Sequence, residues 1–172
     1  MRDLTVINVI GYSNSGKTHL IEISTKLLKQ HLNFNTAVIK NIHEHKIDKE
    51  GKDTYRFINA GAIYAITRNI YYETTIFTRK ELSIIDLIKW LKISPLNIDI
   101  IFIEGFRELE FPTILCIKDI KEIEEQINEN IKMISGIICK ESNIKKKYSN
   151  LPLIGIDKNF DKFLQIFNIN QN

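Results

Sequence analysis

One stretch of the sequence, residues 11–18, has the residue types and the spacing of a phosphate-binding loop. Its letters, GYSNSGKT, fit the pattern G-x-x-x-x-G-K-[ST] at every constrained position. In such a loop, backbone N–H groups surround phosphate oxygens, the lysine reaches the β- and γ-phosphates, and the last hydroxyl binds Mg²⁺. The pattern therefore predicts that Lys17 acts on phosphates and that Thr18 is a magnesium ligand.

The residues on either side of this loop are those that a phosphate-binding loop requires. Residues 4–10 are a β-branched run typical of a buried parallel strand. Apolar residues recur at helical spacing after the loop, which predicts a helix from about Lys17 with its positive end at the phosphates. Together they predict a nucleotide-binding protein rather than a chance match. The candidate contacts are Gly11, Ser13, Asn14, Ser15, Gly16, Lys17 and Thr18, with His19 as a further candidate that could instead face solvent.

A phosphate-binding loop also needs an acidic residue at the end of a neighbouring strand, to hold Mg²⁺ or its water. The apolar run 98–103 delivers Glu104 at its carboxyl end, where Asp is the more usual residue. Asp99 stands at the other end of that strand, about 16 Å away by strand rise, and cannot replace it. We therefore expect Glu104 to be catalytic beside Lys17 and to bind the metal, with a simple cap as the alternative. Arg107 follows closely and could contact a phosphate or be a solvated surface residue.

A long polar segment, residues 41–53, leaves the carboxyl end of a strand expected over 36–40, where α/β sheets collect ligands. His43 and His45 could share a metal there, but no third ligand is suitably spaced, so hydrogen bonding to an anion is favoured. The candidate contacts to an anionic ligand are Lys40, His43, Lys52 and Arg56, and the further candidates for Mg²⁺ are Asp48 and Asp53.

No sequence motif identifies the nucleotide base. An Asn-Lys-x-Asp sequence does not follow any expected strand, so guanine cannot be inferred from a motif. Glu141, just beyond a strand expected over 134–139, could accept hydrogen bonds from a guanine edge. The basic run 145–147 is interpreted as a solvated loop.

Composition agrees with one globular nucleotide-binding domain over residues 1–172. Hydrophobic residues make up 44% and charged residues 26% of the chain, and the net charge is only +3, too small and too scattered to indicate nucleic acid. No apolar run approaches membrane-spanning length, and the chain starts directly with a strand, which leaves no room for a signal peptide. We therefore expect a cytoplasmic protein, with Cys116 and Cys139 as buried strand thiols.

The order of the expected elements predicts a doubly wound α/β fold: a mostly parallel sheet with an antiparallel hairpin, in the three layers of a P-loop NTPase. A capping box at 78–81 is expected to open a helix with Leu82, Ile85, Ile88 and Leu91 facing inward. The other expected elements are a helix from 54 to 61, a hairpin of strands 62–67 and 71–77, strands 98–103, 113–118, 134–139 and 151–156, and helices after Asp119 and Asp157.

These motifs together resemble those of the MobB family, the adaptors of molybdopterin-guanine dinucleotide biosynthesis. The resemblance covers about the first two-thirds of the chain. It rests on the phosphate-binding loop with residues 20–22, on residues 38–40 followed by His43, on the run 48–56 leading into 60–62, and on the Ile-Glu-Gly-Phe sequence at 103–106. The chain departs from the family pattern at Asn41, His45, Glu50 and His19.

The resemblance implies a GTP-binding homodimer that hydrolyses GTP slowly and acts mainly as an adaptor. Such a protein assists the MobA-type guanylyltransferase that joins GMP to molybdopterin, so GTP, Mg²⁺ and molybdopterin are the implied ligands. The alternative from the residues alone is a small P-loop kinase with its own small acceptor. A kinase of this size needs a mobile lid with several arginines, and Arg56, Arg68, Arg79 and Arg107 form no such cluster in the sequence. The adaptor is therefore favoured.

Overall fold

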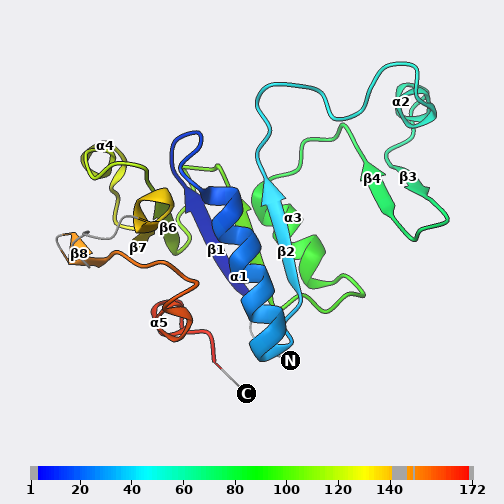
Figure 1. Cartoon of the computed structure of the whole chain (residues 1–172). Coiled ribbons are helices and arrows are strands. Elements are labelled where there is room, and N and C mark those ends of the chain that lie inside the picture. The colour runs from blue at the N-terminus through cyan, green and yellow to red at the C-terminus, as the bar shows by residue number, and fades with distance from the viewer. Residues whose placement is uncertain (1–3, 141–146, 149, 171–172) are drawn as a thin grey trace. The chain divides into compact units, whose positions relative to one another are not determined.

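The computed structural model describes residues 4–140, 147–148 and 150–170, which fall into two compact units (Figure 1). The first unit comprises the chain up to Asn41 and from Trp90 onward, and the second comprises Ile42–Lys89. The single domain predicted over 1–172 stays a prediction. No helix within the described residues is both long enough and apolar enough to cross a membrane.

The first unit is built on a sheet of five parallel strands in the order β2-β5-β1-β6-β7. Because β1 lies between β5 and β6, the loop that follows β1 leaves the middle of the sheet's carboxyl edge. The predicted mostly parallel sheet is therefore confirmed. Its strands are β1 (Thr5–Ile10), β2 (Thr36–Lys40), β5 (Ile100–Glu104), β6 (Thr113–Cys116) and β7 (Ile131–Ser135).

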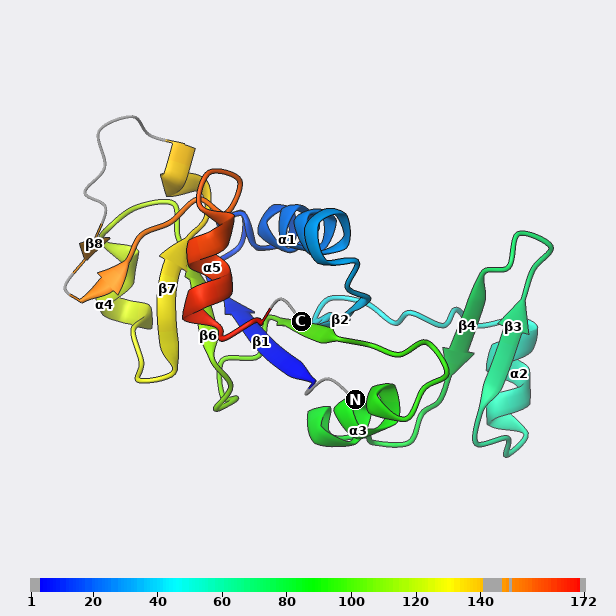
Figure 2. The same cartoon turned by 90° about the horizontal axis from the view of Figure 1, so that it is seen from below.

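Helices cover both faces of this sheet, which confirms the predicted three layers. Figure 2 shows α1 (Lys17–Leu32) and α5 (Phe160–Ile166) on the same side, and their apolar side chains pack against Ile7 and Phe102. The short helix α4 (Glu122–Gln126) packs on the other face through Ile123, which contacts a cluster that includes Ile10. Alternate residues of one strand thus bury into opposite layers.

Helix α1 begins where the sequence predicted and ends at a residue suited to stop it. Gly16 precedes it in the left-handed conformation, and Asn33 follows it with φ 54°. The backbone N–H of Asn33 donates to the carbonyl oxygen of Lys29 at 3.1 Å, which satisfies one of the last free carbonyls. Lys29 and His31 in the last turn complement the negative end of the helix dipole.

The second unit holds a short helix and the predicted hairpin. Helix α2 (Asp53–Asn59) is followed by β3 (Ala65–Arg68) and β4 (Thr74–Phe77), which pair antiparallel and form a two-stranded sheet of their own. Both strands start later than predicted, and β4 does so because Asn69 closes the turn before it. Its side-chain oxygen accepts the backbone N–H groups of Tyr71 and Glu73.

The helix predicted from a capping box at 78–81 begins later, so that prediction was wrong. Helix α3 (Ile84–Lys92) follows Ser83, whose hydroxyl accepts the N–H of Asp86 while the Asp86 carboxylate accepts the N–H of Ser83. Thr78 and Ser83 both stand three residues before an acidic residue. The reciprocal hydrogen bonds of a capping box are those between Ser83 and Asp86. Leu82 precedes the helix and, like Ile85, is exposed rather than inward.

The segment after β7 also differs from the prediction. The strand predicted over 134–139 ends at Ser135, because Gly136 adopts φ +107° and leads the chain into the short 3₁₀ helix η1 (Ile137–Lys140). Cys139 therefore lies on η1 and is only partly buried, whereas Cys116 is a buried strand thiol as predicted.

The last predicted strand, 151–156, joins the sheet only through a parallel bridge between Leu153 and Ile134. Just before that bridge, β9 (Leu151–Pro152) pairs antiparallel with β8 (Lys147–Tyr148). Helix α5 starts at Phe160 rather than directly after Asp157, because residues 155–159 form turns instead of a cap.

Candidate functional site

The loop between β1 and α1 is held in shape by close backbone contacts on two sides. A Cβ at Gly11 would lie 2.1 Å from the carbonyl oxygen of Cys116, so no other residue fits there without a shift. On the other side, a Cβ at Gly136 would lie 2.5 Å from the carbonyl oxygen of Ser15. The backbone N–H of Ile137 donates to that same oxygen at 3.0 Å. The end of β6 and the segment after β7 therefore fix the loop.

Lys17 lies across this loop from the first turn of α1. Its ammonium donates to the carbonyl oxygens of Gly11 at 3.0 Å and of Tyr12 at 2.9 Å. A lysine ammonium has three protons, so one donor is left for a ligand. This arrangement can hold the oxygen of a phosphate beside the N-terminus of the helix.

Glu104 lies beside the loop at the carboxyl end of β5, as the sequence predicted. Its side chain is nearly buried, and its two carboxylate oxygens are each 3.4 Å from the hydroxyl oxygen of Thr18. Nζ of Lys40, at the end of β2, lies 3.4 Å from Oε1 of the same carboxylate. Three predicted site residues from three different elements therefore meet at one carboxylate.

The turn after β5 explains why Glu104 ends up in this position. Gly105 adopts φ +92° and its N–H donates to the carbonyl oxygen of Val9 at 3.1 Å, so the chain turns toward β1. The buried Asn8 side chain of β1 then donates to the carbonyl oxygen of Phe106 at 2.8 Å. The Glu-Gly-Phe sequence is thus a turn anchored on the strand that precedes the phosphate-binding loop.

The residues present fit Mg²⁺, although within the described part of the chain no three His, Cys, Asp or Glu side chains group as a metal site. Mg²⁺ takes one or two protein oxygens together with phosphate oxygens and waters, so a full set of protein ligands is not needed. Thr18 and Glu104 offer hard oxygen ligands on the same side of the loop. These two residues would hold the ion.

The space above the loop is an open cavity of about 450 Å³. Its lining brings together most of the predicted contacts, His19 included. The lining residues are Ser13, Asn14, Ser15, Gly16, Lys17, Thr18, His19, Lys40, Glu104 and Ile137. Its size and its polar lining suit the phosphates of a nucleotide.

Arg107, predicted as a phosphate contact, makes other contacts. Its guanidinium lies over the ring of Tyr12, 5.2 Å from the centroid, and donates to the side-chain oxygen of Gln126 at 2.7 Å. The Tyr12 hydroxyl in turn donates to Glu125 at 2.7 Å, and this hydrogen bond raises the pKa of Tyr12. Arg107 thus supports the loop from outside the cavity lining, and its contact with phosphate stays a prediction.

The remaining candidates belong to the second unit. His43 and Lys52 are exposed, Asp48 accepts the hydroxyl of Thr54 at 2.9 Å, and Asp53 pairs with Arg56 at 3.5 Å. The hydrogen bond between Thr54 and Asp48 holds the segment that leads into α2. The roles predicted for these five residues in binding anion or metal stay predictions.

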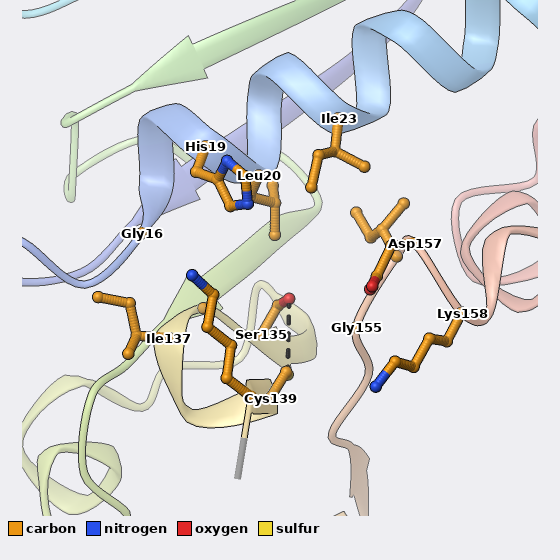
Figure 3. Close-up of a pocket in the computed structure, with 13 residues that line it drawn as sticks. Gly16, His19, Leu20, Ile23, Ser135, Ile137, Cys139, Gly155, Asp157 and Lys158 are labelled. Carbon is orange, nitrogen blue, oxygen red and sulfur yellow. Dashed lines mark hydrogen bonds between the residues drawn. The ribbon is translucent and has the colours of Figure 1, made fainter.

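A second cavity, of about 220 Å³, was not predicted from the sequence (Figure 3). It lies between α1, the segment after β7 and residues 155–158. The sequence did contain an indication of this cavity, since Gly136 and Gly155 each interrupt a largely apolar run. The strands expected over 134–139 and 151–156 included both glycines and so did not predict a break there. Glu141, the predicted base contact, lies outside the described residues.

Comparison with known proteins finds one family throughout. A family model described as "Molybdopterin guanine dinucleotide synthesis protein B" (MobB) matches residues 6–140. The chain is 40% identical over 136 residues to a protein of Methanocaldococcus jannaschii that carries the name of a molybdopterin-guanine dinucleotide biosynthesis adapter protein. That alignment covers 76% of this chain but only 54% of the relative, so the chain spans about half of the relative's length. An adapter protein of the same name from Haemophilus influenzae is 31% identical over 132 residues, which is 72% of each chain.

Solved structures agree in fold. The crystal structure of Bacillus subtilis MobB superimposes with a TM-score of 0.74 at 23% identity, covering 96% of this chain and 99% of that one. A MobB homologue from Bacillus stearothermophilus gives a TM-score of 0.64 at 17% identity, with 95% of each chain covered. At these identities the similarity concerns the fold alone.

Proposed function

The chain belongs to the MobB family, and from that premise we propose that it is a GTP-binding adaptor of molybdopterin-guanine dinucleotide biosynthesis. It binds GTP with Mg²⁺, hydrolyses it slowly, and assists a guanylyltransferase that attaches GMP to molybdopterin. The observation that carries this proposal is the meeting of Thr18 and Lys40 at the Glu104 carboxylate, beside a complete phosphate-binding loop.

Each residue of this site has a part in holding the phosphates. Lys17 donates its remaining N–H in a hydrogen bond to a phosphate oxygen, and the backbone N–H groups at the start of α1 face the same point. Thr18 and Glu104 hold Mg²⁺, which neutralises charge on the phosphate oxygens when it is bound. Lys40, whose ammonium already lies at the cavity, adds a second cation near the terminal phosphate.

The composition of the cavity supports slow hydrolysis and an adaptor role. Fast phosphoryl transfer uses an arginine to stabilise the transition state, which adds about 10³- to 10⁵-fold to the rate. No arginine is among the described residues that line the phosphate cavity. Arg107, which follows Glu104 in the sequence, lies over the ring of Tyr12 and donates a hydrogen bond to Gln126. The same lack disfavours the alternative of a small kinase.

The hairpin of the second unit supports the homodimer. A two-stranded sheet is at best marginally stable alone, and its edges are open to further pairing. Apolar side chains on and around it are exposed: Ile66 by 64%, Ile70 by 83% and Tyr71 by 77%. Exposed apolar side chains beside open strand edges mark a protein interface. We propose that a second copy of this chain covers it, and that molybdopterin and the guanylyltransferase bind the assembled dimer.

Calorimetry with GTP and Mg²⁺ tests the nucleotide site. We expect Lys17→Ala to weaken binding on the order of 10²-fold, because a charge-assisted contact to phosphate is lost. The control is Lys26→Ala, which removes the same charge from an exposed position on α1. Circular dichroism should show both variants folded. Wild-type affinity for GTP in the Lys17 variant would overturn the proposal.

A further inference from the structure

The second cavity adjoins the phosphate cavity. The two share three lining residues, Gly16, His19 and Ile137, at the point where α1 begins. A ligand whose phosphates occupy the loop therefore has this cavity as the adjoining space for its remaining part. Its volume is about 220 Å³, about half that of the phosphate cavity.

Hydrogen bonds hold the walls of this cavity in a fixed position relative to the phosphate-binding loop. The hydroxyl of Ser135 donates to the carbonyl oxygen of Ile154 at 2.7 Å, and the N–H of Ile154 donates to Ile134 at 2.9 Å. These bonds join the end of β7 to residues 153–156. The segment after β7 is itself bonded to the loop through Ile137 and Ser15, at 3.0 Å.

The lining combines apolar walls with one carboxylate and three basic side chains, those of His19, Lys140 and Lys158. Leu20 and Ile23 enter from α1 and Ile137 from the opposite side, which suits the faces of an aromatic ring (Figure 3). Asp157 points its carboxylate into the space. A Cβ at Gly155 would lie 2.9 Å from Oδ1 of Asp157, so glycine at this position leaves room for that carboxylate.

The Asp157 carboxylate is available to a ligand. The chain presents it at a turn in which the N–H of Lys158 donates to the carbonyl oxygen of Gly155 at 3.2 Å. The carboxylate accepts no hydrogen bond from any residue that the structure describes. An ionised carboxylate has two oxygens that only accept, so it suits a ligand edge with two adjacent donors.

We propose that this cavity receives the nucleotide base and that Asp157 selects guanine, an inference that rests on the proposed function. Guanine presents two neighbouring donors, N1–H and the N2 amino group, which match the two carboxylate oxygens. Adenine presents one donor, its N6 amino group, beside the acceptor N1, which repels a carboxylate. Asp157, and not Glu141 as predicted from the sequence, is therefore the residue that reads the base.

The test is calorimetry of the intact chain with Mg²⁺ and four ligands: GTP, ATP, XTP and inorganic tripolyphosphate. Asp157→Asn should lose at least about 10-fold in GTP affinity, since a bidentate base contact is lost. It should gain affinity for XTP, because xanthine has a carbonyl oxygen where guanine has the N2 amino group. Affinity for tripolyphosphate should not change. The control, Asp161→Asn, alters an exposed aspartate on α5 outside this cavity and should behave as wild type.

The outcomes separate this inference from the proposed function. If wild type binds tripolyphosphate and GTP while Asp157→Asn keeps the wild-type preference among GTP, ATP and XTP, the base is read elsewhere and only the inference is overturned. Loss of tripolyphosphate binding in Asp157→Asn would also overturn it, because the residue would then act on the loop. If wild type binds neither GTP nor tripolyphosphate, the proposed function itself is overturned.

Cys139 provides a second measurement, because it lines the same cavity while Cys116 is fully buried. Burial raises the pKa of the Cys139 thiol, so iodoacetamide labelling requires mildly alkaline buffer. We expect GTP to slow the alkylation of Cys139, followed by mass spectrometry, and tripolyphosphate to leave it unchanged. Equal protection by both ligands would overturn the assignment of this cavity to the base.

Discussion

Lys40 and Glu104 stand opposite each other at the ends of β2 and β5, with Nζ of Lys40 3.4 Å from Oε1 of Glu104. The carboxylate side chain is only 8% exposed, whereas the lysine side chain is 51% exposed. The hydroxyl of Thr18 lies 3.4 Å from the same carboxylate. The protein therefore keeps a nearly buried carboxylate between a cation and a hydroxyl, at the edge of the phosphate cavity.

This arrangement predicts that Glu104→Gln lowers Mg²⁺-dependent GTP hydrolysis more than GTP binding. The carboxylate acts on the metal or its water, so we expect a loss of at least about 10²-fold in kcat. Phosphate release measures the rate and calorimetry the affinity, with the exposed Glu108→Gln as control. The unfolding free energy should fall by less than about 1 kcal/mol, because Lys40 remains half exposed. Hydrolysis at the wild-type rate would make Glu104 structural and direct the search for a metal ligand to Asp48 and Asp53.

The close packing of the phosphate-binding loop predicts that Gly11→Ala is strongly destabilising. The new Cβ would lie 2.1 Å from the carbonyl oxygen of Cys116, a backbone atom in the central sheet that cannot easily move. We expect a loss of about 3 kcal/mol or more in the free energy of unfolding, measured with urea.

Gly51→Ala is the matched control for that substitution. Gly51 also has a positive φ, +86°, but a Cβ there would meet nothing within 4 Å. It should cost only the backbone strain, about 1 kcal/mol. Equal losses for the two variants would show that strain alone, and not the contact with Cys116, makes Gly11 necessary.

The site and the sheet were predictable where short contiguous patterns determine them. The loop at 11–18 and the acid at the end of 100–104 follow from residue types next to each other, and parallel strands bring their carboxyl ends together without further information. Lys40 was placed correctly for the same reason, since it ends the neighbouring strand.

The second cavity, which we propose for the base, and the helix start at Ile84 were not predictable, for physical reasons that are specific to each. Residues 134–139 are mostly apolar, with Ser135 and Gly136 between them, and periodicity alone cannot show that Gly136 turns this run into a 3₁₀ helix. Asp157 looks like a helix cap until tertiary bonds between Ser135 and Ile154 place its segment beside α1. Before Ile84, the patterns at 78–81 and 83–86 are equivalent in residue type, and the sequence does not show that the reciprocal bonds form at Ser83 and Asp86.

The exposed hairpin predicts that Ile66→Lys disrupts the proposed homodimer. Ile66 pairs with Ile76 across β3 and β4 and is 64% exposed. A charge at the centre of an apolar interface should weaken dimerisation by at least about 10-fold, measured by sedimentation velocity. The control is Ile47→Lys, at a similarly exposed position (67%) in the polar segment of the same unit. A wild-type protein that remains monomeric at high concentration would contradict the proposed dimer.

The polar segment after β2 separates the adaptor from the kinase. His43 and Lys52 are exposed donors in the residues that follow Lys40, and they suit a second anionic group such as the phosphate of molybdopterin.

On the adaptor hypothesis, the double variant His43→Ala with Lys52→Ala should lower molybdopterin-guanine dinucleotide formation by about 10-fold in a reconstituted assay with a guanylyltransferase. GTP should still bind, because the phosphate-binding loop supplies most contacts. The control, Glu44→Ala with Lys49→Ala, changes two exposed side chains of the same segment that have no predicted ligand role and should retain full activity. A kinase would instead transfer phosphate from GTP or ATP to a small acceptor, and the first double variant would lose that transfer. Cofactor formation at the wild-type rate in the first double variant would show that the segment takes no part in the adaptor function.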